Sequence, residues 1–501
     1  MAIGWKLHGD GKNLAPGEVV APDERLGWGR TIGLGAQHVV AMFGATFVFP
    51  LIMGLNAQLA IMMSGIATIV FLLIVQGKVP SYLGTSAAFV GGAAAIYGQG
   101  GDPADVTGAV LIAGVVLAVV GVAIHFVGTG ALHTVLPPVV TGAVVMLIGF
   151  NLAPVVANVY WPQDQWIAIL TMLAVILMAV GLRGFFGRIA IFLGLIFGYV
   201  LSWVFDQVGP ITSVLPGQNT LGPDGQPCSP EGPYCVATAF EHNRVDWTGV
   251  KAADWIGFPP QSDFANGVVG WHAPTFSLAF VLLMLPAVIA LIAENTGHVK
   301  AVAEMTERDL DPVMGRAIGA DGVGTILASA VGGSPTTTYA ENIGVMAATR
   351  VYSTAAYYVA ACVAIFFGLC PKFGALVSAT PGGVLGGITV VLYGMIGLLG
   401  AKIWKENRVD FANPVNLVPV AAGIIIAIGN TSLRITDDFV LGGIALGTLV
   451  VIGAYHLARA VAPADLRDED VSLIVVDRPG VQAEDGADGP TPPDGGGAHR
   501  R

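Results

Sequence analysis

The chain has 501 residues, of which 54% are hydrophobic and only 11% are charged, and its mean hydropathy is +0.72. A soluble chain carries charge on about a quarter of its residues, so this composition excludes a soluble globular protein and indicates a membrane protein. Most of the net charge of −11 lies in segments 206–273 and 461–501, and no basic cluster with interleaved aromatic residues supports nucleic-acid binding.

Twelve apolar runs are long enough to cross a hydrocarbon layer of about 30 Å. They cover residues 31–54, 57–75, 106–126, 137–156, 165–180, 189–205, 276–293, 314–331, 355–370, 381–399, 415–429 and 441–460. The first thirty residues are polar and contain no signal-peptide pattern, so we expect the first span to direct insertion.

Two further segments, 82–97 and 336–348, are short and rich in Gly, Ser, Thr and Ala. Each is third in its half of the chain, and each opens on a related stretch, VPSYLG (79–84) and SPTTTYA (334–340). Paired interrupted segments of this kind indicate an inverted-repeat transporter with a site near the membrane midplane. We therefore predict an all-α membrane protein of fourteen transmembrane segments in two inverted repeats of seven, with segments 3 and 10 broken.

The distribution of basic residues predicts the orientation. With the amino terminus inside, nineteen of the 23 Lys and Arg residues lie on the inner side, as expected for cytoplasmic loops. We expect a multi-pass protein of the cell (inner) membrane with both termini cytoplasmic and a disordered tail. The loop after segment 7 then lies outside, where an oxidising environment permits a disulfide between Cys228 and Cys235 without requiring one.

Ionisable residues inside the membrane are functional candidates, because each costs roughly 2.5 to 3.5 kcal/mol on insertion scales. Glu294 ends the eighth span, Glu341 lies in the broken tenth segment, and Asp321 is a third candidate. His298 follows Glu294 by four residues, which on a helix places the two side chains within hydrogen-bonding reach. This pair could share a proton, or it could simply cap a helix end. Lone His38 is expected to pack in the core or to line the cavity.

The broken segments predict the substrate class. Interrupted helices leave backbone N–H groups free, and these can donate to the carbonyl oxygens of a base such as uracil, while carboxylates accept from its ring N–H groups. A Thr/Ser-rich packing seam is the structural alternative, and two carboxylates would repel an anionic substrate. Tyr82 and Tyr339 could line the cavity or simply pack.

Four stretches carry a family resemblance. They are QHVVAMFGAT (37–46), PSYLGTSAAF (80–89), AENTGH (293–298) and, most specifically, TTYAENIGVM (337–346). On these stretches the chain resembles the nucleobase–ascorbate (nucleobase:cation symporter 2) transporters, most closely the uracil and pyrimidine permeases, over residues 20–459. That resemblance implies fourteen segments divided into a core domain (segments 1 to 4 and 8 to 11) and a gate domain (5 to 7 and 12 to 14).

The resemblance also implies domain boundaries and residue roles. The boundaries are a cytoplasmic amino terminus (1–30), core parts 31–127 and 276–371, gate parts 134–205 and 380–460, an extracellular loop (206–273) and a cytoplasmic tail (461–501). Glu294 and Glu341 would hydrogen-bond the base, and His298 would take part with Glu294 in proton coupling. Backbone amides would come from Ala87 and Ala340, Tyr339 would adjoin the base, and His38, Tyr82 and Asn342 could line the cavity. Relatives that form dimers make a homodimer plausible.

Two departures from the uracil permease pattern keep alternatives open. This chain has Ala87 where that pattern has Phe, and Ala340 where it has Gly. The smaller Ala87 could widen the cavity for thymine or for a purine such as xanthine or urate, although Glu341 in place of Gln is similar to the pyrimidine branch.

Two other classes fit the sequence less well. An anion transporter of the same architecture would be expected to show a basic residue at the broken segments. An intramembrane metalloprotease would need a motif such as His-Glu-x-x-His, which does not occur. We therefore expect a proton-coupled uracil symporter and neither enzymatic activity nor a cofactor or metal.

Overall fold

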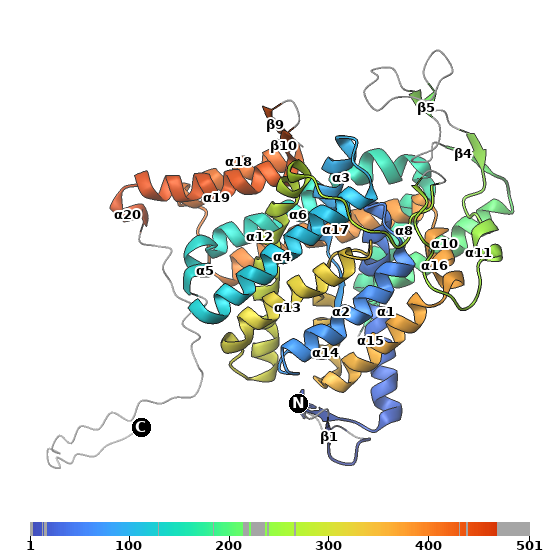
Figure 1. Cartoon of the computed structure of the whole chain (residues 1–501), viewed down its shortest axis with the longest axis horizontal. Helices are drawn as coiled ribbons and strands as arrows, with labels where there is room; N and C mark the ends of the chain where they lie inside the picture. The colour runs from blue at the N-terminus through green and yellow to red at the C-terminus, as the bar shows by residue number, and fades with distance from the viewer. Residues whose placement is uncertain are drawn as a thin grey trace, which may run out of the picture.

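The chain folds into a mostly helical molecule (Figure 1). The computed structural model describes residues 4–12, 14, 18–128, 130–183, 185–213, 220–221, 236–237, 240–264, 267–429, 431–436 and 439–467. Seven helices in this part of the chain are long and apolar enough to cross a membrane, or eight if one bent pair is counted as a single span. The seven are α1 (Trp28–Ile52), α2 (Ala57–Ile74), α4 (Pro103–Val127), α6 with its extension (Pro138–Gln163), α12 (Leu278–Thr306), α17 (Gly382–Glu406) and α19 (Gly443–Val461).

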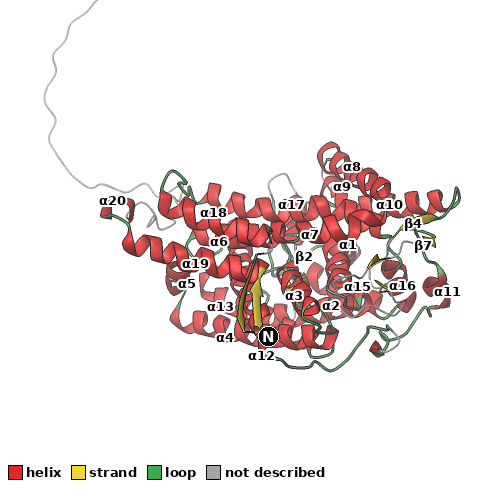
Figure 2. Ribbon diagram, turned by 90° about the horizontal axis from the view of Figure 1, so that it is seen from above, coloured by secondary structure: helices red, strands yellow, loops and turns green. Residues whose placement is uncertain are grey.

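Shorter helices complete the bundle. Those of intermediate length are α8 (Gln165–Gly181), α10 (Ala190–Asp206), α13 (Asp311–Ser329), α15 (Thr354–Gly368), which bends by 82° into α16 (Pro371–Ser378), and α18 (Pro414–Ile428). The shortest are α3 (Val90–Gly98), α5 (Gly130–Val135), α7 (Ala153–Val155), α9 (Phe185–Arg188), α11 (Thr248–Ala252), α14 (Ala340–Thr349) and α20 (Ala464–Arg467). Figures 1 and 2 place α18 and α19 at one end of the long axis and α10, α11 and α16 at the other. Each apolar run predicted from the sequence contains a helix, while the number of membrane crossings stays a prediction.

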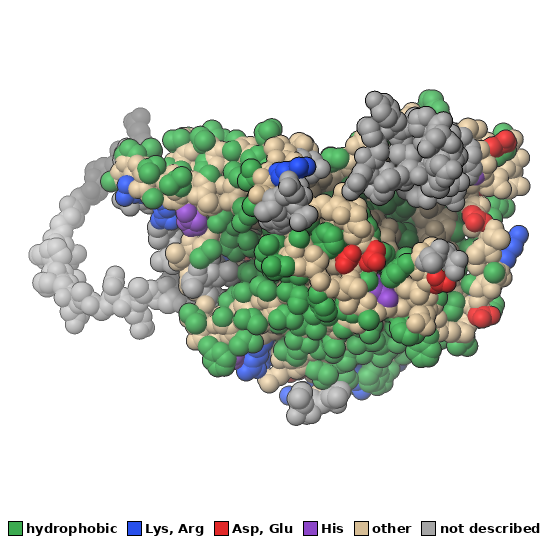
Figure 3. Space-filling view, turned by 45° about the horizontal axis from the view of Figure 1, so that its top comes forward, with side chains coloured by type: hydrophobic (Ala, Val, Ile, Leu, Met, Phe, Trp, Pro, Cys, Tyr) green, Lys and Arg blue, Asp and Glu red, His purple; other side chains and the backbone are tan. Residues whose placement is uncertain are grey.

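The outer surface of the bundle is suited to lipid. A broad hydrophobic area covers much of the face in Figure 3, and large apolar side chains such as Leu177, Ile425 and Leu398 are more than 60% exposed. A soluble monomer rarely exposes contiguous apolar patches beyond a few hundred Å². The chain is therefore a multi-pass membrane protein whose helices satisfy their own backbone hydrogen bonds within the bilayer.

Glycines bring the long helices into close contact. A Cβ on Gly121 of α4 would lie 2.2 Å from the backbone nitrogen of Gly319 in α13, and a Cβ on Gly149 of α6 would lie 2.2 Å from that of Gly397 in α17. Small residues at such crossings let backbones approach closely, which stabilises helix pairs in lipid. The abundance of Gly in the sequence thus reflects dense helix packing.

Substitution of Gly149 by Ala is expected to lower the thermal unfolding temperature of the purified protein. The added methyl group would overpack the α6–α17 crossing, and overpacking of this kind costs about 1–3 kcal/mol. The matched control is Gly394→Ala in α17, where the new Cβ would meet no atom within 4 Å. A Gly149→Ala protein that unfolds at the parent temperature in detergent would show that this crossing tolerates a larger separation.

The feature that positions the site is a pair of three-residue strands inside the bundle. Strand β3 (Leu83–Thr85) pairs antiparallel with β8 (Thr336–Thr338), so that Leu83 lies opposite Thr338 and Thr85 opposite Thr336. Hydroxyl groups of the adjacent helices hold both strands: Leu83 N–H donates to Thr68 Oγ1 at 2.9 Å, and Thr325 Oγ1 donates to Thr336 O at 2.9 Å. Because these helices satisfy the strand edges, extended backbone can lie within the membrane-spanning bundle.

The remaining strands lie outside the bundle. They are β1 (Lys6–Leu7), β2 (Glu24–Arg25), β4 (Ile211–Ser213), β5 (Thr220–Leu221), β6 (Val236–Ala237), β7 (Phe240–His242), β9 (Ser432–Thr436) and β10 (Phe439–Gly442). Cys228 and Cys235, which the sequence predicts as disulfide candidates, lie outside the described residues, as does the tail from residue 468 onward. Cys362 and Cys370 are free thiols.

The loop between α10 and α12 is bonded to helices from both halves of the chain. Arg244 binds Asp164 at the start of α8 through Nε (2.7 Å) and Asp206 at the end of α10 through Nη1 (3.4 Å). Further along the loop, Asp254 O accepts from Lys372 N–H of α16 at 2.9 Å. The loop therefore connects α8 and α10 with α16, which begins where the predicted core part 276–371 ends.

The amino-terminal segment packs against the start of α15. Strands β1 and β2 pair in parallel, and the Trp5 indole donates to Thr354 Oγ1 at 2.8 Å. His8 lies between two carboxylates, with Nδ1 2.7 Å from Glu24 and Nε2 3.1 Å from Glu18. Hydrogen bonding to Glu24 raises the pKa of the His8 imidazole above its ordinary value, and the charges of both carboxylates act in the same direction.

This arrangement predicts that packing of the amino-terminal segment weakens at alkaline pH. Because the folded pKa of His8 is raised, its stabilising contribution is complete below the pKa of the unfolded state, about 6.5, and is lost as the pH rises through the folded value. Hydrogen exchange of residues 4–12, corrected for the intrinsic effect of pH, should therefore accelerate as the pH rises above about 6.5. In His8→Gln the corrected rate should not change with pH; the same pH dependence in both proteins would contradict the assignment.

Candidate functional site

Two helices begin at the paired strands in the middle of the bundle. Strand β3 leads into the 3-10 turn η1 (Ala87–Phe89) and then α3, while β8 leads directly into α14. Hydrogen bonds from Tyr339 N–H to Tyr82 O (3.0 Å) and from Ser86 N–H to Pro335 O (2.9 Å) extend the ladder at both ends. The strand pair thus sets the distance between the two helix starts. Each start carries free N–H groups and the positive end of a helix dipole.

The first residues of these helices are accessible. Ala340 is exposed and Ala87 is half-buried, although both follow fully buried strands. The side chain of Tyr339 does not cap α14, whereas Ser86 Oγ accepts only from Ala88 N–H. Within the described residues no acceptor is bound to the N–H groups of Ala87 and Ala340. Both residues predicted from the sequence therefore offer backbone donors, one beyond each end of the strand pair.

Three carboxylates gather beside the helix starts. Glu294 lies near the middle of α12, Glu341 lies in the first turn of α14, and Asp321 lies in α13. The charges of Glu341 and Asp321 are close enough to interact with the charge of Glu294. Glu294 and Glu341 are half-buried, whereas Asp321 is completely buried. Two carboxylates are thus available to a ligand, and the third lies behind them.

The position of Glu294 corrects one prediction. The apolar run ends at residue 293, which suggested that Glu294 lies at the end of its span, but α12 continues to Thr306 and has 29 residues. The polar residues after Glu294 remain helical because the helix packs against its neighbours on one side. Glu294 is accordingly well inside the helix, and it does not cap an end.

A chain of hydrogen bonds joins α12, β8 and α13. His298 Nδ1 lies 2.8 Å from Thr338 Oγ1, and Thr338 Oγ1 donates to Asn295 Oδ1 at 2.8 Å. Asn295 Nδ2 in turn donates to Asp321 Oδ2. The direct bond between His298 and Glu294 that the four-residue spacing suggested does not occur among the described residues, because the imidazole is bonded to β8.

Asn295 and Thr338 received no role from the sequence, although both lie within the motifs 293–298 and 337–346. A signal was available, since each is a polar residue next to a predicted site residue. Their role in the structure is to connect His298 with Asp321.

A second cluster fixes α14 to α1. Asn342 Nδ2 donates to His38 O at 2.9 Å, and the His38 ring contacts that of Tyr357 at a tilt of 33°, with centroids 4.3 Å apart. His38 is 1% exposed and Asn342 is fully buried. Their contacts orient the first turn of α14, which carries Glu341. A cavity-lining role for the two residues stays a prediction.

The two tyrosines of the strand pair are also packed. Tyr339 Oη donates to Thr85 O at 2.7 Å and accepts from Thr46 Oγ1 at 3.2 Å, and Tyr82 Oη lies 3.0 Å from Ser64 Oγ. A Cβ on Gly84 would lie 2.5 Å from the Tyr339 ring. The Tyr339 side chain therefore fixes the strand crossing, and its backbone leads into Ala340. No cluster of three His, Cys, Asp or Glu residues in the described part of the chain could hold a metal ion.

Comparisons with known proteins identify relatives across most of the chain. A family model described as "Permease family" matches residues 29–435. RutG of Escherichia coli (strain K12), which bears the name of a pyrimidine permease, is 43% identical over 441 residues, or 87% of this chain and 90% of its own. The uracil permease of Bacillus caldolyticus is 34% identical (84% of this chain, 90% of its own), and that of Escherichia coli (strain K12) is 33% identical (89% and 94%).

Similarity also extends to a solved structure. The structure of SLC26A9 aligns with a TM-score of 0.53 at 10% sequence identity, covering 85% of this chain and 64% of that one. At this level of identity the likeness concerns the fold alone.

Proposed function

The chain belongs to the nucleobase–ascorbate transporter family, and from this premise we propose that it imports uracil or a related pyrimidine base together with a proton. Its relatives are permeases, so the chain is a membrane transporter and not an enzyme. The printed names of those relatives support a nucleobase as the substrate.

The observation that carries the proposal is the convergence of two helix starts and two accessible glutamates at the β3–β8 pair. In the proposed complex, Glu294 and Glu341 accept hydrogen bonds from ring N–H groups. The N–H groups of Ala87 and Ala340 donate to carbonyl oxygens. A planar neutral ring with alternating N–H and C=O groups satisfies both sets at once, which favours binding because unpaired polar groups in a buried site are costly.

Proton coupling follows from the charges at this location. Glu294, Glu341 and Asp321 are like charges in a partly buried site, and binding of a proton relieves their repulsion. A neutral base does not relieve this repulsion between the carboxylates. The proton therefore stabilises the loaded site by reducing its negative charge, and the base stabilises it through hydrogen bonds. In the proposal, Glu294 and His298 take part in proton coupling, and the bonds through Thr338 and Asn295 connect His298 to Asp321.

The proposed transport cycle uses the domain division predicted from the sequence. Fourteen segments in two inverted repeats would form a core (31–127 and 276–371) and a gate (134–205 and 380–460), in the inner membrane with cytoplasmic termini. The β3–β8 pair and α12 belong to the core in this division, so the substrate site would move with the core relative to the gate. A homodimer stays a prediction.

Two alternatives differ in substrate. A purine such as xanthine or urate would need more room, and the small side chain of Ala87 leaves space for that. An anion is disfavoured by the specific observation that Glu294 and Glu341 both adjoin the helix starts.

Uptake into proteoliposomes tests the proposal. With an inward proton gradient, labelled uracil should accumulate above its equilibrium level, and a protonophore should abolish the accumulation. Unlabelled uracil, thymine, xanthine, urate and ascorbate would be compared as competitors. Uptake that is unchanged when the gradient is collapsed would remove the coupling. Xanthine or urate that competes at lower concentration than unlabelled uracil would reassign the substrate.

A further inference from the structure

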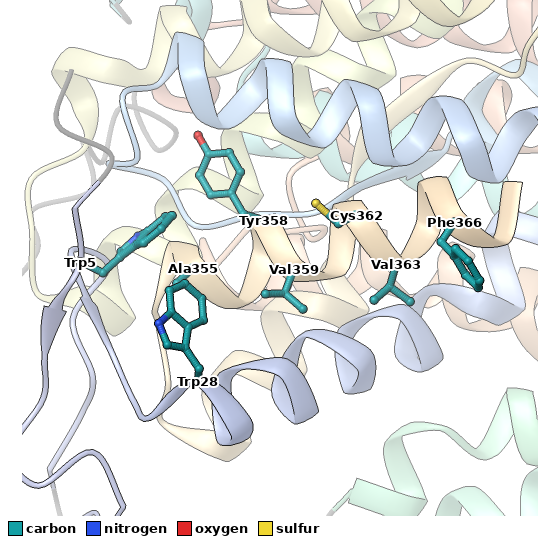
Figure 4. Close-up of a pocket in the computed structure, with 8 residues that line it drawn as sticks. All are labelled: Trp5, Trp28, Ala355, Tyr358, Val359, Cys362, Val363 and Phe366. Atoms are coloured by element: carbon teal, nitrogen blue, oxygen red, sulfur yellow. The ribbon is translucent and has the colours of Figure 1, made fainter. Parts of the chain in front are cut away.

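A groove runs along the outer surface between α1 and α15 (Figure 4). It has a volume of about 370 Å³, and almost all of its lining surface is apolar. The residues that line it are Trp5, Trp28, Ala355, Tyr358, Val359, Cys362, Val363 and Phe366. The transport site does not include these residues, and the helices of the described chain leave the groove open to the lipid side.

The length of the groove matches one leaflet of a bilayer. Figure 4 places Trp5 and Trp28 at one end and Phe366 at the other. From Ala355 to Phe366 the helix rises by about 16 Å, at roughly 1.5 Å per residue. Half of a hydrocarbon core of about 30 Å has nearly the same depth. One acyl chain could therefore lie along α15 for the full depth of its leaflet.

The end of the groove near the amino terminus is lined by two tryptophans, as is typical of a membrane interface. The rings of Trp5 and Trp28 contact each other edge to face with centroids 6.3 Å apart, and Trp28 is 48% exposed. Tryptophan is enriched at the headgroup level, where its ring is apolar and its N–H is polar. The two indoles also limit how far a lipid could move along the groove, because the lipid headgroup would contact them.

A cation lies at this mouth. The Arg25 guanidinium lies over the Trp28 ring, 4.7 Å from its centroid, and Arg25 Nη1 donates to Leu26 O. The neighbouring carboxylates are engaged elsewhere, Glu24 by His8 and Asp23 by Arg308. Arg25 itself forms no ion pair within the described ranges, which leaves its charge available to an anion at the membrane surface.

We propose that this groove binds an anionic phospholipid, with the phosphate at Arg25 and one acyl chain along α15. In the proposed orientation of the chain, this is a lipid of the cytoplasmic leaflet. Trp5, which forms one wall of the mouth, also donates to Thr354 at the start of α15. A bound lipid consequently stabilises the packing of the amino-terminal segment against the core.

Native mass spectrometry of the full chain in detergent tests this assignment, with phosphatidylglycerol and phosphatidylethanolamine added in equal amounts. The parent protein should retain phosphatidylglycerol in preference. Arg25→Gln should reduce that retention by about fivefold, the effect expected for one basic residue at the membrane surface, and should leave phosphatidylethanolamine unchanged. Cys362→Trp, which fills the groove from an exposed position, should reduce retention of both lipids.

Two controls separate a specific site from general lipid adhesion. Lys405→Gln removes an exposed cation from the end of α17, and Leu398→Trp enlarges an exposed apolar residue of the same helix. Neither should change lipid retention. Equal retention of the two lipids by the parent, or an Arg25→Gln protein that behaves as Lys405→Gln does, would overturn the proposal. The readout does not depend on uracil transport.

Discussion

Replacement of Glu341 by Gln is expected to weaken uracil binding by about 10- to 150-fold. The carboxylate lies in the first turn of α14 beside the free N–H of Ala340, and in the proposed complex it accepts a hydrogen bond from the base. Hydrogen bonds to charged groups contribute roughly 1.5–3 kcal/mol, which corresponds to this range of affinity. The side-chain amide introduced by Glu341→Gln can also place its N–H donors opposite the ring N–H donors of the base, where no hydrogen bond can form.

Isothermal titration of the purified protein with uracil measures this effect. The matched control is Glu304→Gln, which changes an exposed carboxylate near the end of α12 and should bind uracil as the parent does. If Glu341→Gln binds uracil with the parent affinity, the carboxylate does not contact the base, and the site must lie elsewhere.

Substitution of Gly84 by Ala is expected to reduce uracil uptake by about 100-fold. The new Cβ would lie 2.5 Å from the Tyr339 ring and 2.6 Å from Thr46 Oγ1, so the ring must move. Its bond to Thr85 O would be lost, and the start of α14 would shift with it. Displacement of positioned groups by about 1 Å can have effects of this order.

Initial uptake rates in proteoliposomes measure this second effect, after size-exclusion chromatography has shown that the variant is folded. The control is Gly98→Ala at the end of α3, where a Cβ would meet no atom within 4 Å. Gly84→Ala should fail while Gly98→Ala transports normally. Parent-like uptake by Gly84→Ala would show that the strand crossing does not position the site.

Much of the helical fold could be predicted from the sequence because apolar runs of about twenty residues have few alternatives in a membrane. The boundaries were less predictable. Helix α12 extends to Thr306 beyond its apolar run, and α15 bends by 82° into α16, where the sequence suggested one span followed by a loop. Hydropathy reports contact with lipid, so it does not detect a helix that continues into a polar environment.

The residues of the candidate site could be proposed from the sequence, but the contacts between them could not. Buried carboxylates and broken segments are conspicuous, and Glu294, Glu341, Ala87 and Ala340 do lie around one strand pair. The partner of His298 could not be foreseen, because the four-residue spacing to Glu294 is local whereas its bond to Thr338 depends on tertiary packing. In the same way, the long-range contact with Asn342 determines that His38 is packed.

A structure of the protein with uracil bound tests the proposed site most directly. We expect the ring between the starts of η1 and α14, with its N–H groups within hydrogen-bonding distance of Glu294 and Glu341 and its carbonyl oxygens at the N–H groups of Ala87 and Ala340. A uracil molecule bound away from the β3–β8 pair, or one that contacts neither glutamate, would contradict it.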